Sequence, residues 1–212
     1  MIYLVITDIQ NKKDCHFKWQ SDKLFDEKVK NYIDNSKSKK TKLERLAAYT
    51  TLLCSLKKFF SIEQIEIEKN KNGKPYLDKE NVFFSISHSD NLAVIALSDE
   101  GEIGVDAQSF VDENKANRLE KRFLSDIKIK NNQVEMKIFY FDFSGDKPIF
   151  IEKNLDIDRD DDFLSKWVYS ESVIKYWGTN FSDILKINSL SENTKTQIIS
   201  YQNNKIAITI SK

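Results

Sequence analysis

Three short stretches of the sequence hold residue types that could bind a phosphate group or a divalent cation. The first, SISHS at residues 85–89, places His88, one of two histidines in 212 residues, among three serines. Hydroxyl groups, an imidazole and nearby backbone amides together suit phosphate oxygens. The alternative is that His88 is a turn residue hydrogen-bonded to the backbone.

Two carboxylates in the other stretches could complete such a site. Asp106 ends the apolar run IGVD, where a carboxylate is usually a helix N-cap or a loop residue but can also be catalytic. In KWVYSESVIKYWG, residues 166–178, helical spacing puts Glu171 one turn before Lys175. This pair could be a surface ion pair worth roughly 0.3–0.5 kcal/mol. Two tryptophans and an isoleucine predict partial burial instead, and a buried carboxylate needs a partner such as a cation.

The elements around these stretches decide where the side chains lie. Turn residues divide segment 81–106 into apolar strands, which places His88 and Asp106 at strand ends. Helical spacing of apolar residues predicts a helix over residues 42–60. Alternating apolar residues predict a strand before the Gly-Lys-Pro turn at 73–75, a hairpin at 134–152 around SGDKP, and a final hairpin at 196–211 turning at Asn203 and Asn204.

Composition excludes several classes of protein. A hydrophobic fraction of 40% suffices for a buried core, and 33 basic against 33 acidic residues give no global field for nucleic acid or an anionic membrane. Cys15 and Cys54 make no disulfide framework, and no stretch approaches the roughly 18 apolar residues of a membrane span. The apolar start MIYLVITDIQ has no basic leader, so we expect a cytosolic protein without nucleic-acid or membrane partners.

Charge is nevertheless unevenly spread along the chain. Residues 23–45 hold eight Lys or Arg against four Asp or Glu, whereas DIDRDDD at 156–162 holds five aspartates and one arginine. We interpret both runs as solvated surface.

Four blocks occur in the order NGKP, FFSISHS, IGVDAQ and W-x-x-x-E-S-x-x-K, and EKRFL follows the third at 120–124. This order resembles the 4'-phosphopantetheinyl transferases, specifically the larger, two-lobed type that activates surfactin synthetase. The resemblance covers about half of the chain, most of residues 40–125 and then 165–180. It implies an α+β fold of two similar lobes, a pseudo-dimer with the active site in the cleft between them. We place these lobes at residues 1–108 and 109–212, and the hairpin at 134–152 is an insertion relative to compact relatives.

The family's activity implies the partners of this chain. Its members move phosphopantetheine from coenzyme A to a serine hydroxyl of a carrier protein, with Mg2+, and release adenosine 3',5'-bisphosphate. By resemblance, the cofactor is therefore Mg2+, the co-substrate is coenzyme A and the partner is an apo acyl or peptidyl carrier protein. We expect the chain to act as a monomer.

The resemblance also assigns roles to single residues. The catalytic residues it implies are Glu171, which takes the proton of the attacking serine directly or through a metal-bound water, Lys175, which steadies the pyrophosphate, and His88, which touches a coenzyme A phosphate. The coenzyme A site it implies comprises Arg45 at the 3'-phosphate, Lys74 and Pro75 by the nucleotide, and Ser87, His88 and Lys175. The metal ligands it implies are Asp106, Gln108 and Glu171.

Two positions depart from the family pattern. Gln108 stands where a second acid is usual, and because an amide oxygen carries no negative charge we expect weaker metal binding. Ser170 stands where the family has a lysine that faces the cofactor, and Lys166, one helical turn earlier, could partly replace it. These departures favour one alternative, a non-catalytic relative that binds coenzyme A or a carrier protein. An unrelated α+β binding protein is the third possibility, which four ordered blocks disfavour.

Overall fold

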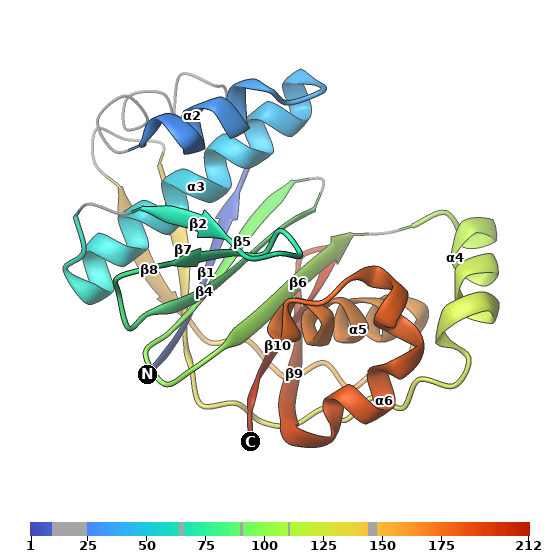
Figure 1. Ribbon diagram of the computed structural model, residues 1–212. Coiled ribbons are helices and arrows are strands. Elements are labelled where there is room, and N and C mark those ends of the chain that lie inside the picture. Colours follow the sequence, from blue (N-terminus) through green and yellow to red (C-terminus); the bar gives the residue numbers. More distant parts are fainter. Residues whose placement is uncertain (10–24, 64–65, 90, 110, 144–147) are drawn as a thin grey trace.

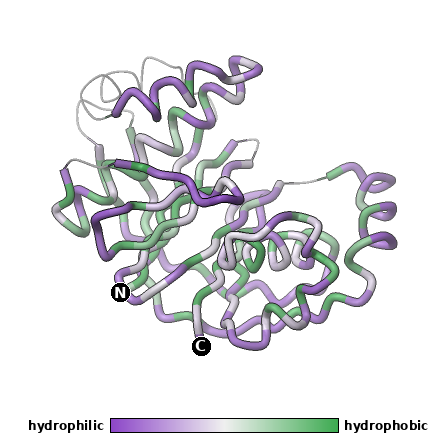
Figure 2. Tube along the Cα trace, viewed as in Figure 1, coloured by the Kyte–Doolittle hydropathy of each residue, from purple (hydrophilic) through white to green (hydrophobic). Residues whose placement is uncertain are grey.

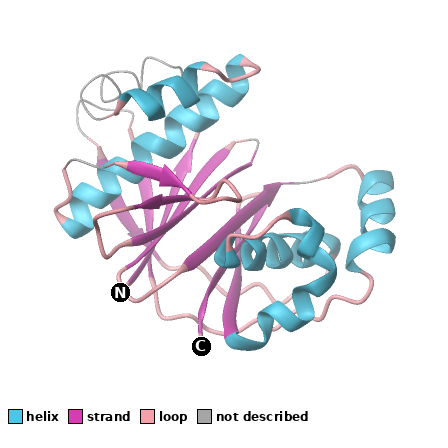
Figure 3. Cartoon of the chain, in the orientation of Figure 1, coloured by secondary structure: helices cyan, strands magenta, loops and turns pink. Residues whose placement is uncertain are grey.

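The computed structural model describes residues 1–9, 25–63, 66–89, 91–109, 111–143 and 148–212. Over these residues the chain is a mixed α+β fold in which two packed β-sheets lie between helices (Figures 1 and 3). The predicted α+β class is therefore confirmed, whereas the two-lobed, pseudo-dimeric arrangement stays a prediction.

The larger sheet takes strands from both halves of the chain. Its five strands run in the order β4-β5-β1-β7-β8. β1 pairs antiparallel with β5 and parallel with β7. The strands are β1 (Ile2–Asp8), β4 (Phe83–Ser89), β5 (Leu92–Ser98), β7 (Lys137–Asp142) and β8 (Ile149–Lys153).

Helix α3 (Lys39–Phe60) covers one face of the larger sheet. The Ser38 hydroxyl caps its first turn by accepting a hydrogen bond from the Thr41 N–H, and Ser61, with a φ of 58°, ends it. Leu52 and Leu56 of this helix pack on strand residues and have no exposed surface. The predicted helix over 42–60 is thus confirmed, with its start one turn earlier.

The smaller sheet has three antiparallel strands in the order β6-β10-β9. These are β6 (Ile103–Ser109), β9 (Thr194–Tyr201) and β10 (Asn204–Ser211). Helix α5 (Phe163–Trp177) covers one face, capped at its start by Asp162 and at its end by Gly178. Gly104 allows this contact, because a Cβ there would lie 2.0 Å from the Ser172 carbonyl oxygen on α5.

The remaining faces of the two sheets pack against each other. Alternate side chains of a strand point to opposite faces of its sheet. In β1 and β5, one set of alternate side chains therefore packs against α3 and the other set packs against the smaller sheet. Leu4 and Val94 of the larger sheet belong to the same buried cluster as Val105 and Ile208 of the smaller one. The order of layers is therefore α3, larger sheet, smaller sheet, α5.

Shorter elements complete the described chain. They are α2 (Glu27–Asp34), β2 (Ile67–Lys69), β3 (Pro75–Leu77), α4 (Glu113–Leu119), a π-helical turn (Glu120–Leu124), two 3-10 helices (Phe181–Lys186 and Ser191–Asn193) and α6 (Ile187–Leu190). Figure 2 shows mainly hydrophilic residues along α2 and hydrophobic residues along the central strands. None of the described helices combines the length and apolar character needed to cross a membrane.

The predicted strands and hairpins form, with differences in detail. The strand before the Gly-Lys-Pro turn is β2, which pairs with β3. β7 and β8 form the hairpin expected at 134–152, although residues 144–147 of its SGDKP turn lie outside the described residues. β9 and β10 form the final hairpin, but it turns at Gln202 and Asn203, with Gln202 at a φ of 53°, and Asn204 begins β10. The expected lobe boundary at residue 108 falls within β6, and both sheets hold strands from both sides of it.

Candidate active site

The site is built where β4 and β6 lie side by side, each an end strand of its own described sheet. No backbone pairing joins these two strands within the described residues. Instead, three serine hydroxyls of β4 accept hydrogen bonds from backbone N–H groups of β6. The pairs are Ser85 with Val105 (3.0 Å), Ser87 with Ala107 (3.2 Å) and Ser89 with Ser109 (2.8 Å). We call Ser85, Ser87 and Ser89 the serine ladder.

The serine ladder explains the spacing of SISHS. Serines at every second position share one face of β4, and N–H groups at every second position of β6 point to the same side of that strand. His88 lies between two ladder serines and therefore points to the other face, toward α3. Its Nδ1 lies 3.5 Å from Oε2 of Glu44, a buried residue of α3. His88 is thus at a strand end, as predicted.

A network of charged hydrogen bonds joins β4, β6 and α5. The Lys175 ammonium donates to Oδ1 of Asp106 at 2.7 Å and to the Ser87 hydroxyl at 3.0 Å. The Ser87 hydroxyl in turn donates to the same Asp106 oxygen at 2.9 Å. Asp106 is buried, with 6% of its surface exposed. The fold therefore brings together residues that are up to 88 positions apart in the sequence, from three of the four motif blocks.

Glu171 contributes a second carboxyl group beside Asp106. Burial, followed by the negative charge of Asp106, raises the pKa of Glu171 to about 7, and Lys175 opposes this shift. No hydrogen bond to this carboxyl group forms among the described residues. Two mutually repelling, partly desolvated carboxylates are a donor set that a small divalent cation would satisfy.

Gln108 completes the predicted set of metal ligands. It lies two positions after Asp106 on β6, so both side chains share the strand face that α5 covers. Its Nε2 donates to the Ser109 carbonyl at 3.3 Å, so the Oε1 atom is the one that a metal ion could use. Among the described residues no group of three or more His, Cys, Asp or Glu side chains could hold a metal ion. Two acids and one amide are the kind of donor set that suits Mg2+, which usually keeps several waters and substrate oxygens as its other ligands.

His88 lies at the rim of this site. Burial lowers the pKa of His88, Glu44 raises it, and the positive charges of Lys175 and Arg45 lower it, although 39% of the side chain is exposed. The sequence did not identify Glu44 as a partner of His88. The one available sign was that Glu44 is an acidic residue among the apolar positions of a predicted helix.

Arg45, Lys74 and Pro75 lie outside the hydrogen-bond network of Asp106. The Arg45 guanidinium donates to the Tyr32 carbonyl at 2.7 Å and lies 4.0 Å from the centre of the Tyr32 ring. Lys74 donates to the carbonyl oxygens of Tyr176 at 3.1 Å and Ile103 at 3.3 Å.

Pro75 lines a pocket of about 210 Å3 next to Lys74. Tyr76, Phe84 and Glu102 line the same pocket. Both predicted nucleotide-side residues are therefore neighbours on one small pocket.

Ser170 does not face a ligand site, contrary to expectation. It has no exposed surface, and its hydroxyl donates to the Lys166 carbonyl at 2.8 Å within α5. Lys166 does not take its place near Asp106, because its ammonium pairs with Glu120 at 3.1 Å. The α5 residues that reach the site are Glu171 and Lys175.

The acidic run DIDRDDD is exposed at Asp156, Asp160, Asp161 and Asp162, as expected of a solvated surface, but the side chain of Asp158 is only 8% exposed. Lys205 of β10, only 10% exposed, places its ammonium 2.8 Å from Asp158, 2.9 Å from Asp160 and 3.3 Å from Asp162. We call these four residues the lysine clamp. A single lysine in the final hairpin gave no sign of this pairing, because the partners are more than forty positions apart.

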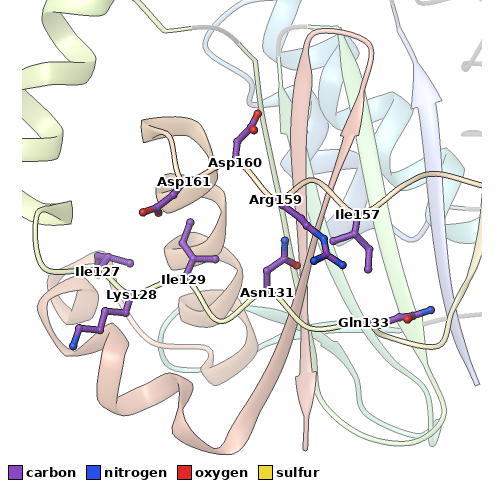
Figure 4. A pocket seen from close by; sticks show the side chains of 9 residues that line it. All are labelled: Ile127, Lys128, Ile129, Asn131, Gln133, Ile157, Arg159, Asp160 and Asp161. Atoms are coloured by element: carbon purple, nitrogen blue, oxygen red, sulfur yellow. The ribbon is translucent and has the colours of Figure 1, made fainter.

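A separate groove of about 630 Å3 lies beside β9 (Figure 4). Its walls are segment 127–133 and segment 157–161, and Arg159 and Asn131 point into it. None of its lining residues is one of the predicted site residues.

Comparison with known proteins gives one similarity to report. The chain is 31% identical over 86 residues to a Synechocystis sp. protein provisionally named as a 4'-phosphopantetheinyl transferase. The match covers 37% of this chain and 35% of that protein, so the chain spans about a third of the relative's length. No family model matches the chain. The similarity supports a relationship to the phosphopantetheinyl transferase superfamily.

Proposed function

We propose that this chain transfers 4'-phosphopantetheine from coenzyme A to a serine of an apo acyl or peptidyl carrier protein, and that it is of the two-lobed, surfactin-synthetase-activating type. The observation that carries the proposal is the convergence of Ser87, Asp106 and Lys175 on one hydrogen-bonded centre, with Glu171 beside it. These residues come from three of the four motif blocks. The named similarity to a phosphopantetheinyl transferase is the independent support.

The proposed metal site consists of Asp106, Glu171 and Gln108. When bound there, Mg2+ would neutralise negative charge on the pyrophosphate of coenzyme A. In the ligand-free chain the Lys175 ammonium is the counter-ion of Asp106, at 2.7 Å. We propose that Lys175 leaves Asp106 for a pyrophosphate oxygen when coenzyme A and Mg2+ bind, so that each charge keeps a partner throughout.

The proposed reaction uses Glu171 as the base. The hydroxyl oxygen of the carrier serine forms a bond to the phosphorus that bears the pantetheine, and the bond from that phosphorus to the bridging oxygen breaks. Adenosine 3',5'-bisphosphate leaves with the bridging oxygen, and the serine proton passes to Glu171. A carboxyl group with a pKa of about 7 is well matched to accept a proton at neutral pH.

Other residues serve substrate binding in this proposal. Ser87 and His88 would contact coenzyme A phosphates at the end of β4, and Lys74 and Pro75 would lie by the nucleotide. Arg45 would reach the 3'-phosphate, although its guanidinium is engaged with Tyr32 in the ligand-free chain. We propose that the protein acts as a monomer in the cytosol.

The test is to incubate the protein with coenzyme A, Mg2+ and a panel of apo carrier proteins and then to weigh the carriers. We expect at least one carrier to gain the mass of phosphopantetheine, and omission of Mg2+ or replacement of the carrier serine by alanine to prevent the gain. If coenzyme A binds but no carrier from any pathway gains mass, the protein is a binding relative and the proposal fails.

A further inference from the structure

We infer that Ser85 and Ser89 are positioning residues, which hold β4 in register against β6 and so keep Ser87 in contact with Asp106. The inference rests on the proposed function for its catalytic consequence, but its structural basis is independent of that function. It concerns the two ladder serines that are not themselves proposed to touch coenzyme A.

Hydroxyl acceptors are needed at these positions because β6 is an end strand with buried N–H groups. Val105 has no exposed surface and Ala107 has 2%, so their outward N–H groups cannot bond to water. A buried backbone N–H without an acceptor is costly, and Ser85 and Ser87 supply the acceptors for these two. Ser89 does the same for the half-buried N–H of Ser109. A short hydroxyl side chain reaches across from β4 where a backbone carbonyl does not.

The ladder also fixes the relative position of the functional groups. The outer contact, Ser89 with the N–H of Ser109, lies next to Gln108, and the inner contact, Ser85 with the N–H of Val105, lies next to Asp106. A slip of β4 by one residue would turn all three serines away from β6 and bring His88 to the wrong face. The register of β4 within its own sheet is held by its pairing with β5. No backbone pairing joins β4 to β6 within the described residues, so the serine contacts are the hydrogen bonds to the β6 backbone that align these two strands.

Ser89→Ala is the first variant that tests this inference, with Ser55→Ala as matched control. Ser55 is also buried, but its hydroxyl donates only to the Thr51 carbonyl within α3. We expect Ser89→Ala to speed hydrogen exchange at the Ser109 N–H by about tenfold and Ser55→Ala to leave it unchanged. Ser89→Thr keeps the hydroxyl and should restore slow exchange. Ser85→Ala should act in the same way at the Val105 N–H.

The second readout is function at a temperature where all variants are folded. We expect Ser85→Ala and Ser89→Ala to lower kcat/KM for carrier modification by about ten- to a hundredfold, through kcat, because misplaced catalytic groups slow the chemical step. Ser89→Thr should recover most of the rate, and Ser55→Ala should keep it. If Ser85→Ala does not fold, Ser89→Ala at the strand end still decides the question.

Two results would overturn the inference. One is unchanged exchange at the Ser109 N–H in Ser89→Ala, which would mean that the ladder contact does not exist in solution. The other is faster exchange with kcat/KM within twofold of the original protein, which would leave the serines a purely structural role. If the chain modifies no carrier at all, coenzyme A affinity measured by calorimetry replaces kcat/KM, and an unchanged affinity in both alanine variants overturns the inference. These measurements therefore distinguish a failure of the proposed function from a failure of the inference about Ser85 and Ser89.

Discussion

Asp106 and Lys175 hold opposite charges in contact at the centre of the candidate site, and a third residue, Ser87, bonds to both. The Ser87 hydroxyl gives its one hydrogen to Asp106 and accepts hydrogens from Lys175 and the Ala107 N–H. Its hydrogen-bonding capacity is therefore fully used. A ligand that binds here must therefore replace one of the existing hydrogen bonds of Ser87, because Ser87 has no capacity for another.

The first prediction concerns the charge of Asp106. Asp106→Ala should abolish Mg2+-dependent transfer, a loss of at least about a hundredfold, because it removes the buried carboxylate of the proposed metal site. Gln108→Glu should lower the Mg2+ concentration needed for half-maximal activity, since it adds a charged ligand. Titration of Mg2+ against activity measures both. Asp106→Asn controls for side-chain volume, and an unchanged Mg2+ requirement in Asp106→Ala would remove Asp106 from the metal site.

The second prediction concerns the protonation of Glu171. Its pKa in the folded chain, about 7, lies above the ordinary 4.5, so the native state holds this proton more tightly than the unfolded state does. The resulting stability is complete below about pH 4.5 and is lost as the pH rises through about 7. Mg2+ competes with the proton, so apparent Mg2+ affinity should increase from about pH 6 to pH 8.

Thermal unfolding with and without Mg2+ over this pH range tests the second prediction. The gain in Tm on addition of Mg2+ should grow with pH in the original protein and should be nearly independent of pH in Glu171→Gln. A gain in Tm that does not change with pH in the original protein would show that Glu171 is already ionised, or is no ligand.

At the scale of elements, α5 carries Glu171 and Lys175 and is held on the smaller sheet at several points. Its middle touches β6 at Gly104, where no larger residue fits. The lysine clamp holds the N-terminus of α5 on the smaller sheet, because Asp162 is both the N-cap of α5 and an ion-pair partner of Lys205. On β10, Lys205 lies opposite Gln108 of β6 in the strand pairing. The clamp therefore anchors the helix next to the candidate metal ligands.

The third prediction is that Lys205→Met destabilises the fold by about 3 kcal/mol and lowers Tm by roughly 6–12 °C, because it leaves the buried carboxylate of Asp158 without its partner. Burial raises the pKa of Asp158, but the hydrogen bonds from Lys205 and Ser200 outweigh burial and lower it overall. The stabilisation should accordingly be present at neutral pH and lost as the pH falls through the lowered pKa of Asp158.

Chemical denaturation at pH 7 measures this loss. Asp161→Asn is the matched control, since Asp161 belongs to the same acidic run but is not a partner of Lys205. Asp158→Asn in the Lys205→Met background should recover part of the stability, because it removes the unpaired charge. If Lys205→Met and Asp161→Asn cost the same, the lysine clamp does not stabilise the fold.

At the scale of the whole molecule, local sequence patterns predicted the helices and strands but not the contacts between elements that are distant in the sequence. Apolar spacing sufficed for α3, for α5 and for the hairpins, and the motif blocks identified Asp106, Glu171 and Lys175 as neighbours. Nothing local indicated that β7 would pair in parallel with β1, or that Lys205 would meet the acidic run. The prediction that position 170 faces the cofactor was wrong, because a motif position gives only the expected residue type. Whether Ser170 is buried depends on how α5 packs on β10, which the motif does not show.

The strand order crosses the point at which the sequence suggested a lobe boundary. β6 precedes or includes residue 108 yet pairs with β10 near the end of the chain, whereas β7 follows that residue yet pairs with β1 at its start. Each sheet is therefore completed only when both halves of the chain are present. The buried cluster between the sheets, which contains Leu4, Val94 and Ile208, likewise draws on both halves.

The last prediction follows from this exchange of strands: residues 1–108 alone will not fold cooperatively. In that fragment β1 loses its neighbour β7, β6 loses β10 and α5, and the sheet face bearing Leu4 and Val94 loses its cover. Most of the cost comes from apolar side chains left in water, at about 25 cal/mol for each Å2 exposed. Circular dichroism and thermal unfolding of the fragment, with the full chain as control, measure the outcome. A sharp thermal transition in the fragment would show that residues 1–108 are an independent domain and that the strand exchange is not required for stability.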